Sequence, residues 1–352
     1  MSLTFQNYIG GRWLDARSGA TFTNIDPATG ERLGEFPDSG AEDVAAAAEA
    51  ARAALRGWQL TPAPKRGELL YRLAALIASK KEALARAATR EMGKILLETR
   101  GDVQEGVDMA YLAAGEGRRM YGVTTPSEMP DKWAMSVRVP IGVVGVITAW
   151  NFPFAVPTWK IFPALVAGNT VVFKPSEETP EMGWHLAQLF EEVGLPAGVF
   201  NVVHGNGNNV GWPMVQHPGI DVVSFTGSNA VGQQIATECA RTGKRVSLEM
   251  GGKNGVIVMD DADLALAASA VAWGAFGTTG QRCTATSRVI VHERVHDELA
   301  KLVVQRAQAL RLGSGLEPAT EMGPLVNAKQ LERVSGYIQV AADEGATVAA
   351  GG

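Results

Sequence analysis

One of the two cysteines in this 352-residue chain, Cys283, lies among small and hydroxylated residues in the run Gly277 to Ala285. Such neighbours leave a thiol exposed and let a substrate approach the backbone. A thiolate is a strong nucleophile near neutral pH, so Cys283 is a candidate for attack on an electrophilic carbon. Most buried cysteines are instead small apolar core residues, and Cys239, at the end of a helical pattern, is interpreted in that way.

Two polar residues follow apolar runs elsewhere in the chain. Asn151 comes shortly after the run Val143 to Thr148, and its amide could donate a hydrogen bond to a developing oxyanion. A turn asparagine is the alternative. Glu249 ends the run that begins at Val246, and its carboxylate could act as a general base for water. A capped surface glutamate remains the alternative.

A cofactor site is indicated by two further strand ends. Lys174 follows an apolar run, and Glu177 stands three residues later, so the two could meet a ribose or a phosphate, although a solvated ion pair is the simpler reading. The run Thr226 to Gly232 places small residues at a helix N-terminus, where backbone amides can approach a pyrophosphate. Neither Gly-x-Gly-x-x-Gly nor a Walker sequence is present.

A metal site is not predicted. The string His292 to His296 matches His-Glu-x-x-His, which places two imidazoles on one face when it is helical. Here it directly follows a strand pattern, Arg288 to Val291, so the pair is expected to straddle a strand-to-helix junction. The other three histidines lie in unrelated segments.

The elements that must position these residues alternate between apolar runs and helical patterns. The runs are predicted at Val143 to Thr148, Thr170 to Phe173, Phe200 to Val203, Val222 to Phe225 and Val246 to Leu248, with helices around 159–166, 182–193, 210–215 and 231–239. This alternation predicts an α/β fold with a doubly wound parallel sheet, whose ligands bind at the carboxyl ends of the strands.

Other segments are predicted to be scaffold. Two short strands surround Gly10-Gly11, and long helices cover Val44 to Trp58, Lys65 to Arg90 and about Ile95 to Gly117, with Ser39 placed to cap the first. Val256 to Met259 is predicted to be a strand, and Leu264 to Phe276 a helix. The segment Gly122 to Pro140 alternates apolar and polar residues and predicts an extended ribbon that pairs with another subunit or forms an exposed hairpin of its own domain.

Composition bounds the function classes. The chain is 46% hydrophobic and 20% charged, with a net charge of −5, so its charge gives no reason to bind nucleic acid or an anionic membrane. Two cysteines are too few for a disulfide framework. The start of the chain does not match a signal peptide, and no apolar run reaches the length of a membrane span, so a cytoplasmic protein is expected.

Taken together, several motifs resemble the aldehyde dehydrogenase superfamily in their order and spacing. They are Trp150-Asn151-Phe152-Pro153, Phe173-Lys174-Pro175-Ser176, Phe225-Thr226-Gly227-Ser228, Leu248-Glu249-Met250-Gly251-Gly252-Lys253 and Gly280-Gln281-Arg282-Cys283. The resemblance implies a cofactor domain at 1–121 and 141–250, an oligomerisation ribbon at 122–140 and an α/β catalytic domain at 251–352. It also implies a homodimer or homotetramer.

The resemblance implies a role for each candidate group. Cys283 would attack an aldehyde, and Asn151 with the backbone N–H of Cys283 would hold the oxyanion; Glu249 would activate the water that hydrolyses the resulting thioester. A glutamate at this position favours hydrolysis over transfer to coenzyme A. The run that ends at Cys283 looks closest to branches that oxidise semialdehydes.

The resemblance also implies a dinucleotide site and a substrate tunnel. Lys174 and Glu177 would hold the adenosine ribose, and the carboxylate would repel a 2′-phosphate, so NAD is favoured over NADP, which stays possible. The full cofactor set is Ile147, Trp150, Lys174, Glu177, Gly227, Ser228 and Gly232, and the tunnel residues are Phe152, Trp159 and Thr284.

The family's later Glu-x-Phe-Gly-Pro stretch would lie beyond Gly352. We therefore expect a catalytic domain that is incomplete at its C-terminus, with an apolar sheet edge left unpaired. This expectation keeps an alternative open, namely a catalytically impaired or noncatalytic dinucleotide-binding protein.

Overall fold

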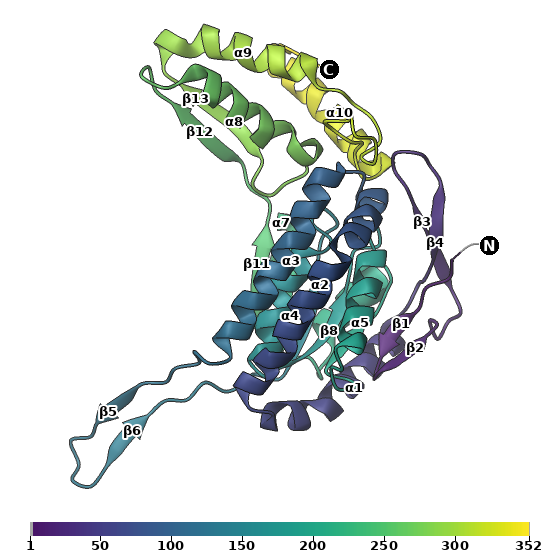
Figure 1. Cartoon of the computed structure of the whole chain (residues 1–352), viewed down its shortest axis with the longest axis vertical. Helices are drawn as coiled ribbons and strands as arrows, with labels where there is room; N and C mark the ends of the chain where they lie inside the picture. Colours follow the sequence, from purple (N-terminus) through teal and green to yellow (C-terminus); the bar gives the residue numbers. More distant parts are fainter. Residues whose placement is uncertain (1–2, 352) are drawn as a thin grey trace.

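A parallel sheet forms the centre of the computed structural model, which describes residues 3–351 (Figure 1). The strand order is β11-β10-β7-β8-β9-β1-β2; the first five strands run parallel, and β1 and β2 extend one edge antiparallel. The strands are β1 (Asn7–Ile9), β2 (Arg12–Leu14), β7 (Val143–Ile147), β8 (Thr170–Lys174), β9 (Phe200–Val202), β10 (Val222–Gly227) and β11 (Arg245–Met250). The predicted parallel sheet is confirmed.

Helices cover both faces of this sheet, because alternate side chains of each buried strand point to opposite sides. On β7, Val144 and Val146 join the core beneath α2, α3, α4 and α5, whereas Val143 and Ile147 join the core beneath α1, α6 and α7. These helices are α1 (Ala41–Leu60), α2 (Ala63–Met92), α3 (Leu96–Glu116), α4 (Ala155–Val166), α5 (Glu181–Glu192), α6 (Trp212–Gln216) and α7 (Asn229–Thr242). A π-helical turn, Gly207–Gly211, precedes α6. The doubly wound arrangement is therefore confirmed.

The predicted cap of α1 is wrong. The N–H of Gly40 donates to the side chain of Asp43 at 3.1 Å, while the hydroxyl of Ser39 accepts a hydrogen bond from the amide of Asn7 at 2.8 Å. Ser39 therefore belongs to a buried contact between the arm and the sheet. A carboxylate three residues into the helix satisfies the backbone donor instead.

Two hairpins lie outside the central sheet. β3 (Thr21–Ile25) pairs with β4 (Arg32–Pro37), and β5 (Thr124–Pro126) pairs with β6 (Trp133–Met135), each antiparallel. The second hairpin projects from the body at the lower left of Figure 1. Its apolar side chains are exposed, among them Trp133 at 67% and Met135 at 57%. The predicted extended ribbon is confirmed as a projecting hairpin.

A smaller α/β part follows β11. Its parallel strands β12 (Asn254–Val258) and β13 (Thr286–Val291) are covered by α8 (Leu264–Phe276) and α9 (His296–Ala309), and α10 (Ala328–Asp343) comes last. Short 3-10 turns lie at Gly277–Gly280 and Glu293–Val295. Ile257 and Ile290, on the two-stranded sheet, are 69% and 57% exposed.

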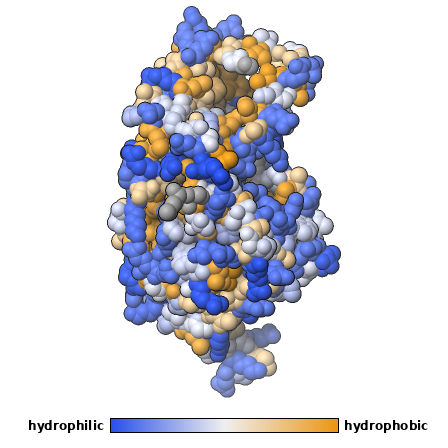
Figure 2. Space-filling view, turned by 90° about the vertical axis from the view of Figure 1, so that its right-hand side faces the viewer, coloured by the Kyte–Doolittle hydropathy of each residue, from blue (hydrophilic) through white to orange (hydrophobic). Residues whose placement is uncertain are grey.

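A cleft of about 810 Å³ lies between α3 and the pair α8 and α9, with Trp273 and Phe276 among its lining residues. Figure 2 shows apolar side chains around a hollow in the upper part of the molecule. Within residues 3–351, no helix has the length and hydropathy to cross a membrane.

Candidate active site

The candidate residues gather at the carboxyl edge of the parallel sheet. Strand register places Ile147 opposite both Lys174 and Phe225, and Thr226 opposite Glu249. Because parallel strands end on the same side, the segments that follow β7, β8, β10 and β11 share one edge, where open α/β sheets bind ligands.

The cysteine loop is held in an unusual backbone conformation. After α8 the chain turns through Thr278 and Thr279, both with positive φ (53° and 57°), and then through Gly280. Non-glycine residues adopt this conformation rarely, and it persists where surrounding contacts enforce it. The amide of Asn254 fixes the end of the loop by donating to the carbonyl of Cys283 at 2.8 Å. The Cys283 side chain itself is exposed.

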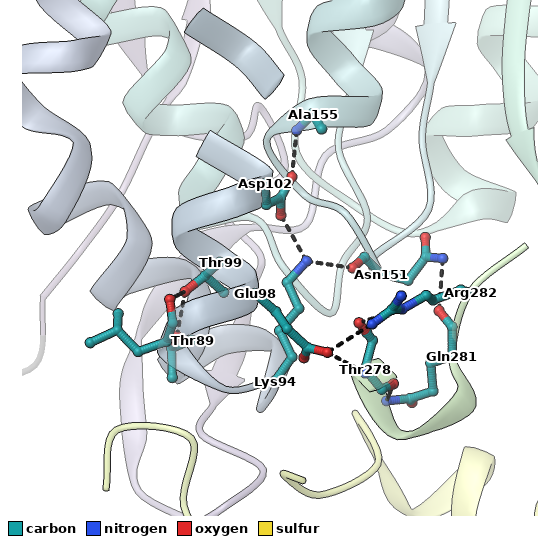
Figure 3. Close-up of polar contacts among 11 residues, drawn as sticks. Thr89, Lys94, Glu98, Thr99, Asp102, Asn151, Ala155, Thr278, Gln281 and Arg282 are labelled. Carbon is teal, nitrogen blue, oxygen red and sulfur yellow. Dashed lines mark hydrogen bonds and ion pairs between the residues drawn. The ribbon is translucent and has the colours of Figure 1, made fainter. Parts of the chain in front are cut away.

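Asn151 and the cysteine loop are in direct contact. The Asn151 side-chain nitrogen, Nδ2, donates to the carbonyl of Gln281 at 2.9 Å, two residues before Cys283 (Figure 3). An amide NH₂ has two hydrogens, so this bond leaves one donor for another oxygen. The structure thus brings together two of the three predicted catalytic segments, which are 130 residues apart in the sequence.

Glu249 is exposed at the end of β11, and a lysine that the sequence analysis missed lies close to it. Lys160 on α4 donates to the hydroxyl of Ser224 at 3.2 Å and to the carbonyl of Phe225 at 3.3 Å. Burial lowers the pKa of Lys160, and the negative charge of Glu249 partly opposes this effect. Lys160 thus places a basic side chain near the carboxylate of Glu249. In the sequence Lys160 is one charged residue of a predicted helix, and no local pattern marked it as part of the site.

Lys174 and Glu177, the two residues predicted to hold a ribose, form an ion pair. Lys174, 3% exposed, contacts the carboxylate of Glu177 at 2.9 Å. Burial alone would raise the pKa of Glu177, but the Lys174 charge and hydrogen bond, together with hydrogen bonds from the backbone, outweigh it, and the pKa is lowered. Beside this pair the rings of His204 and Phe36 are in contact, and burial with the Lys174 charge lowers the pKa of His204 to about 3. His204 is therefore neutral, and the positive charge of Lys174 is balanced by the carboxylate of Glu177.

The donor set at this edge fits a dinucleotide. Thr226 has a buried hydroxyl with no partner among the described residues, and Ser228 caps α7 by accepting from the N–H of Val231 at 3.3 Å. A Cβ at Gly211 would lie 3.8 Å from the Lys174 side chain, an ordinary contact distance, so the π-helical turn packs against the stem of this lysine. At one sheet edge, the exposed N-terminus of α7 offers amides to a pyrophosphate, and the Lys174–Glu177 pair offers a carboxylate to ribose hydroxyls.

Two predicted cofactor glycines are also required by packing. A Cβ at Gly227 would lie 2.3 Å from the ring of Phe225, and a Cβ at Gly232 would lie 2.4 Å from the sulfur of Met250. Gly232 therefore lets α7 pack against β11. Ile147 is buried at the end of β7, and Trp150 is partly exposed in the loop before Asn151.

The predicted substrate residues lie around the same loops. The ammonium of Lys94 lies over the ring of Phe152, 4.1 Å from its centroid. Trp159 on α4 is 38% exposed, and Thr284 is exposed beside Cys283. Phe152 is thus already fixed on one face.

The two histidines of the His-Glu-x-x-His string lie at the end of a strand and the start of a helix. His292 accepts from the N–H of Arg294 at 3.3 Å, whereas His296 begins α9 and is hydrogen-bonded to Asp297 at 2.8 Å. Residues 3–351 contain no group of three or more His, Cys, Asp or Glu side chains placed to hold a metal ion.

The chain is similar to known proteins along its whole length. The sequence model of the Aldehyde dehydrogenase family matches residues 13–352. An alpha-ketoglutaric semialdehyde dehydrogenase of Bacillus subtilis is 44% identical over 350 residues, which are 99% of this chain and 72% of that protein. A succinate-semialdehyde dehydrogenase [NADP(+)] of Escherichia coli is 40% identical over 347 residues, again 99% and 72%.

A solved structure, the NAD+ complex of an aldehyde dehydrogenase from Bacillus cereus, superposes with a TM-score of 0.97 at 39% identity. The match covers 99% of this chain and 72% of that one.

Proposed function

The chain belongs to the aldehyde dehydrogenase family, and from that premise we propose which of its residues oxidise an aldehyde to a carboxylic acid. It is an NAD(P)-dependent enzyme by its relatives, and the noncatalytic alternative is not favoured, since the relatives that it matches at about 40% identity are dehydrogenases. The observation that carries the assignment of residues is the 2.9 Å contact between the Asn151 amide and the cysteine loop.

We propose the following sequence of bond changes. The Cys283 thiolate attacks the aldehyde carbon; a C–S bond forms, and the carbonyl π pair moves to oxygen. The free N–H of Asn151 and the backbone N–H of Cys283 stabilise that oxyanion. NAD(P), held by Lys174, Glu177 and the N-terminus of α7, would supply the hydride acceptor; when the carbon has lost its hydride, the oxyanion pair re-forms the C=O bond and Cys283 carries the acyl group as a thioester. Glu249 takes a proton from a water molecule as the water oxygen attacks the thioester carbon. The C–S bond then breaks to release the acid and the Cys283 thiolate.

We further propose that the substrate is a semialdehyde and that Phe152, Trp159 and Thr284 line its path. Support comes from the relatives, several of which are semialdehyde dehydrogenases by name. The test is the absorbance at 340 nm with a panel of aldehydes that carry or lack a distal carboxylate. We expect a higher kcat/KM for the carboxylate-bearing members; equal or lower values for them would exclude the semialdehyde preference.

The same absorbance assay, run with NAD and with NADP, tests the proposed preference for NAD. Glu177 is held as a carboxylate by Lys174, so it accepts from ribose hydroxyls and repels a 2′-phosphate. We expect a higher kcat/KM with NAD than with NADP. In Glu177→Gln, the ratio of the two kcat/KM values should fall about tenfold. Glu178→Gln is the matched control. Among the described residues, Lys174 forms its ion pair with Glu177 and forms none with Glu178. A preference for NADP in the unaltered chain would contradict the proposal.

We also propose that the hairpin β5–β6 pairs with another subunit, to form a homodimer or homotetramer. Its exposed apolar side chains support this, since contiguous apolar surface marks association sites. Sedimentation is expected to show an oligomer that Trp133→Asp converts largely to monomer, whereas Leu60→Asp, an equally exposed apolar site on α1, leaves it intact. A monomeric unaltered chain would rule the proposal out.

We likewise propose that residues 1–121 and 141–250 form a cofactor domain, 122–140 a ribbon and 251–352 a catalytic domain. The test is limited proteolysis, in which cleavage within 251–253 should release two folded parts.

A further inference from the structure

One face of α3 contacts both loops that carry the proposed catalytic groups. Glu98 and Asp102 are four residues apart on α3 and therefore lie on the same side of it. Figure 3 shows Asp102 directed toward Lys94 and Glu98 toward the segment 278–282. We propose that Lys94, Glu98 and Asp102 are positioning residues that aim the amide of Asn151 at the substrate oxygen. This inference rests on the oxyanion role proposed for Asn151.

Lys94 and Asp102 hold the backbone on both sides of the Asn151 turn. Their side chains are fully buried and 2.9 Å apart. The Lys94 ammonium also donates to the carbonyl of Asn151 at 2.9 Å, and Asp102 accepts from the N–H of Ala155, the first residue of α4, at 2.7 Å. The ring of Phe152 lies against the same ammonium. The pair thus fixes the backbone carbonyl of Asn151 and the first N–H of α4.

Glu98 holds the other loop. One carboxylate oxygen accepts from the guanidinium of Arg282 at 2.8 Å and from the N–H of Thr278 at 2.7 Å. Arg282 in turn contacts the Thr278 hydroxyl at 3.0 Å and stacks over Trp273. These bonds close the turn with two residues of positive φ, and Gln281, whose carbonyl receives the Asn151 amide, lies inside that turn.

Asn151 is therefore held at both ends, by Lys94 in the turn that precedes α3 and by the loop that Glu98 of α3 closes. Lys94 binds its backbone oxygen, and the loop closed by Glu98 presents the carbonyl that orients its side-chain nitrogen. Burying the two charges of an ion pair carries a large desolvation cost, and apolar packing alone often gives equal or greater stability. Hydrogen bonds to charged groups are short and directional, so the arrangement suits fixing a donor within a few tenths of an ångström.

The test is a double-mutant cycle with Asn151→Ala. In Lys94→Met/Asp102→Asn both charges are removed together, so no buried charge is left unpaired, and the asparagine oxygen still accepts from Ala155. Activity is measured with an aldehyde and cofactor, and independently as cofactor-free hydrolysis of p-nitrophenyl acetate, which needs the nucleophile, the oxyanion donor and the base for water but no hydride acceptor. Lys81→Met is the control, because it removes another contact between α2 and α3, the 2.7 Å bond to Gln104.

We expect the double variant to lower kcat in both assays about ten- to a hundredfold, with the KM for the cofactor unchanged. In the Asn151→Ala background the same change should cost less than about threefold, because the donor that it aims is gone. Lys81→Met should leave kcat within about twofold. Equal losses in the two backgrounds, or no loss in either, would overturn the proposal.

Glu98→Gln provides a second variant at a less buried position, in case the first does not fold. The glutamine oxygen still accepts from Thr278, but the charge opposite Arg282 is lost. A fall in kcat of about three- to thirtyfold that disappears in the Asn151→Ala background supports the inference, and a fall that persists there contradicts it. If Asn151→Ala itself leaves both activities unchanged, its oxyanion role is wrong and this inference fails with it; if only the coupling is absent, the oxyanion role stands.

Discussion

Cys283→Ser is expected to lower the kcat for aldehyde oxidation by at least about 10⁴-fold, the largest loss among single substitutions. An alkoxide is far less accessible than a thiolate at neutral pH, so the serine hydroxyl would be a poor nucleophile without a dedicated base. The serine also removes the sulfur leaving group on which the hydrolytic step depends. The measurement is the initial rate at 340 nm together with the stoichiometry of iodoacetamide labelling.

Cys239→Ala is the matched control, because the chain holds only these two cysteines. Cys239 is fully buried in the core between α7 and the sheet, and burial raises the pKa of its thiol. Its substitution should leave kcat within about twofold and labelling at one site per chain. Activity retained in Cys283→Ser, or lost only in Cys239→Ala, would show that the nucleophile has been misidentified.

Glu249→Gln is expected to give a different signature. Steady-state turnover should fall about 10²- to 10⁴-fold, because the water that attacks the thioester loses its base. Acylation of Cys283 does not use that water, so a burst of about one NADH per chain should survive. Rapid-mixing absorbance at 340 nm separates the burst from the steady state.

Glu238→Gln is the control for this substitution. Glu238 lies on α7, the helix next to β11, and pairs with Arg241 at 2.7 Å on the surface. Its loss should change neither phase. A Glu249→Gln protein that keeps full turnover, or that loses the burst and the steady state equally, would contradict a role confined to hydrolysis.

The regular elements could be predicted because each buried strand is a short apolar run and each helix has its own apolar stripe. The helix Leu264 to Phe276 was predicted at its observed bounds, and each of the five parallel strands within two residues. Ser39 was misassigned because a serine before a helix matches the pattern of a cap, while its actual partner, Asn7, is 32 residues away.

The site could be predicted only in part. Cys283, Asn151 and Glu249 could be named from residue type and motif, since the chemistry needs a thiol, a donor and a base. Their mutual placement depends on contacts such as that between Asn151 and Gln281, which join distant segments and leave no local pattern.

Lys94, Glu98, Asp102 and Lys160 were missed for the same reason. In the sequence they look like the ordinary charged residues of solvent-exposed helices. Only the packing of α3 and α4 against the strand ends shows that Lys94 and Asp102 are fully buried and that Lys160 lies near Glu249. Tertiary contacts therefore changed scaffold residues into candidates for the site.

The most direct test of the account is the intact mass of Glu249→Gln after mixing with NAD and an aldehyde substrate, followed by peptide mapping. We expect an added mass equal to the acyl group on one residue, Cys283, that decays slowly and is released by hydroxylamine. An unmodified protein that has nonetheless produced its equivalent of NADH, or an acyl group found on any residue other than Cys283, would contradict it.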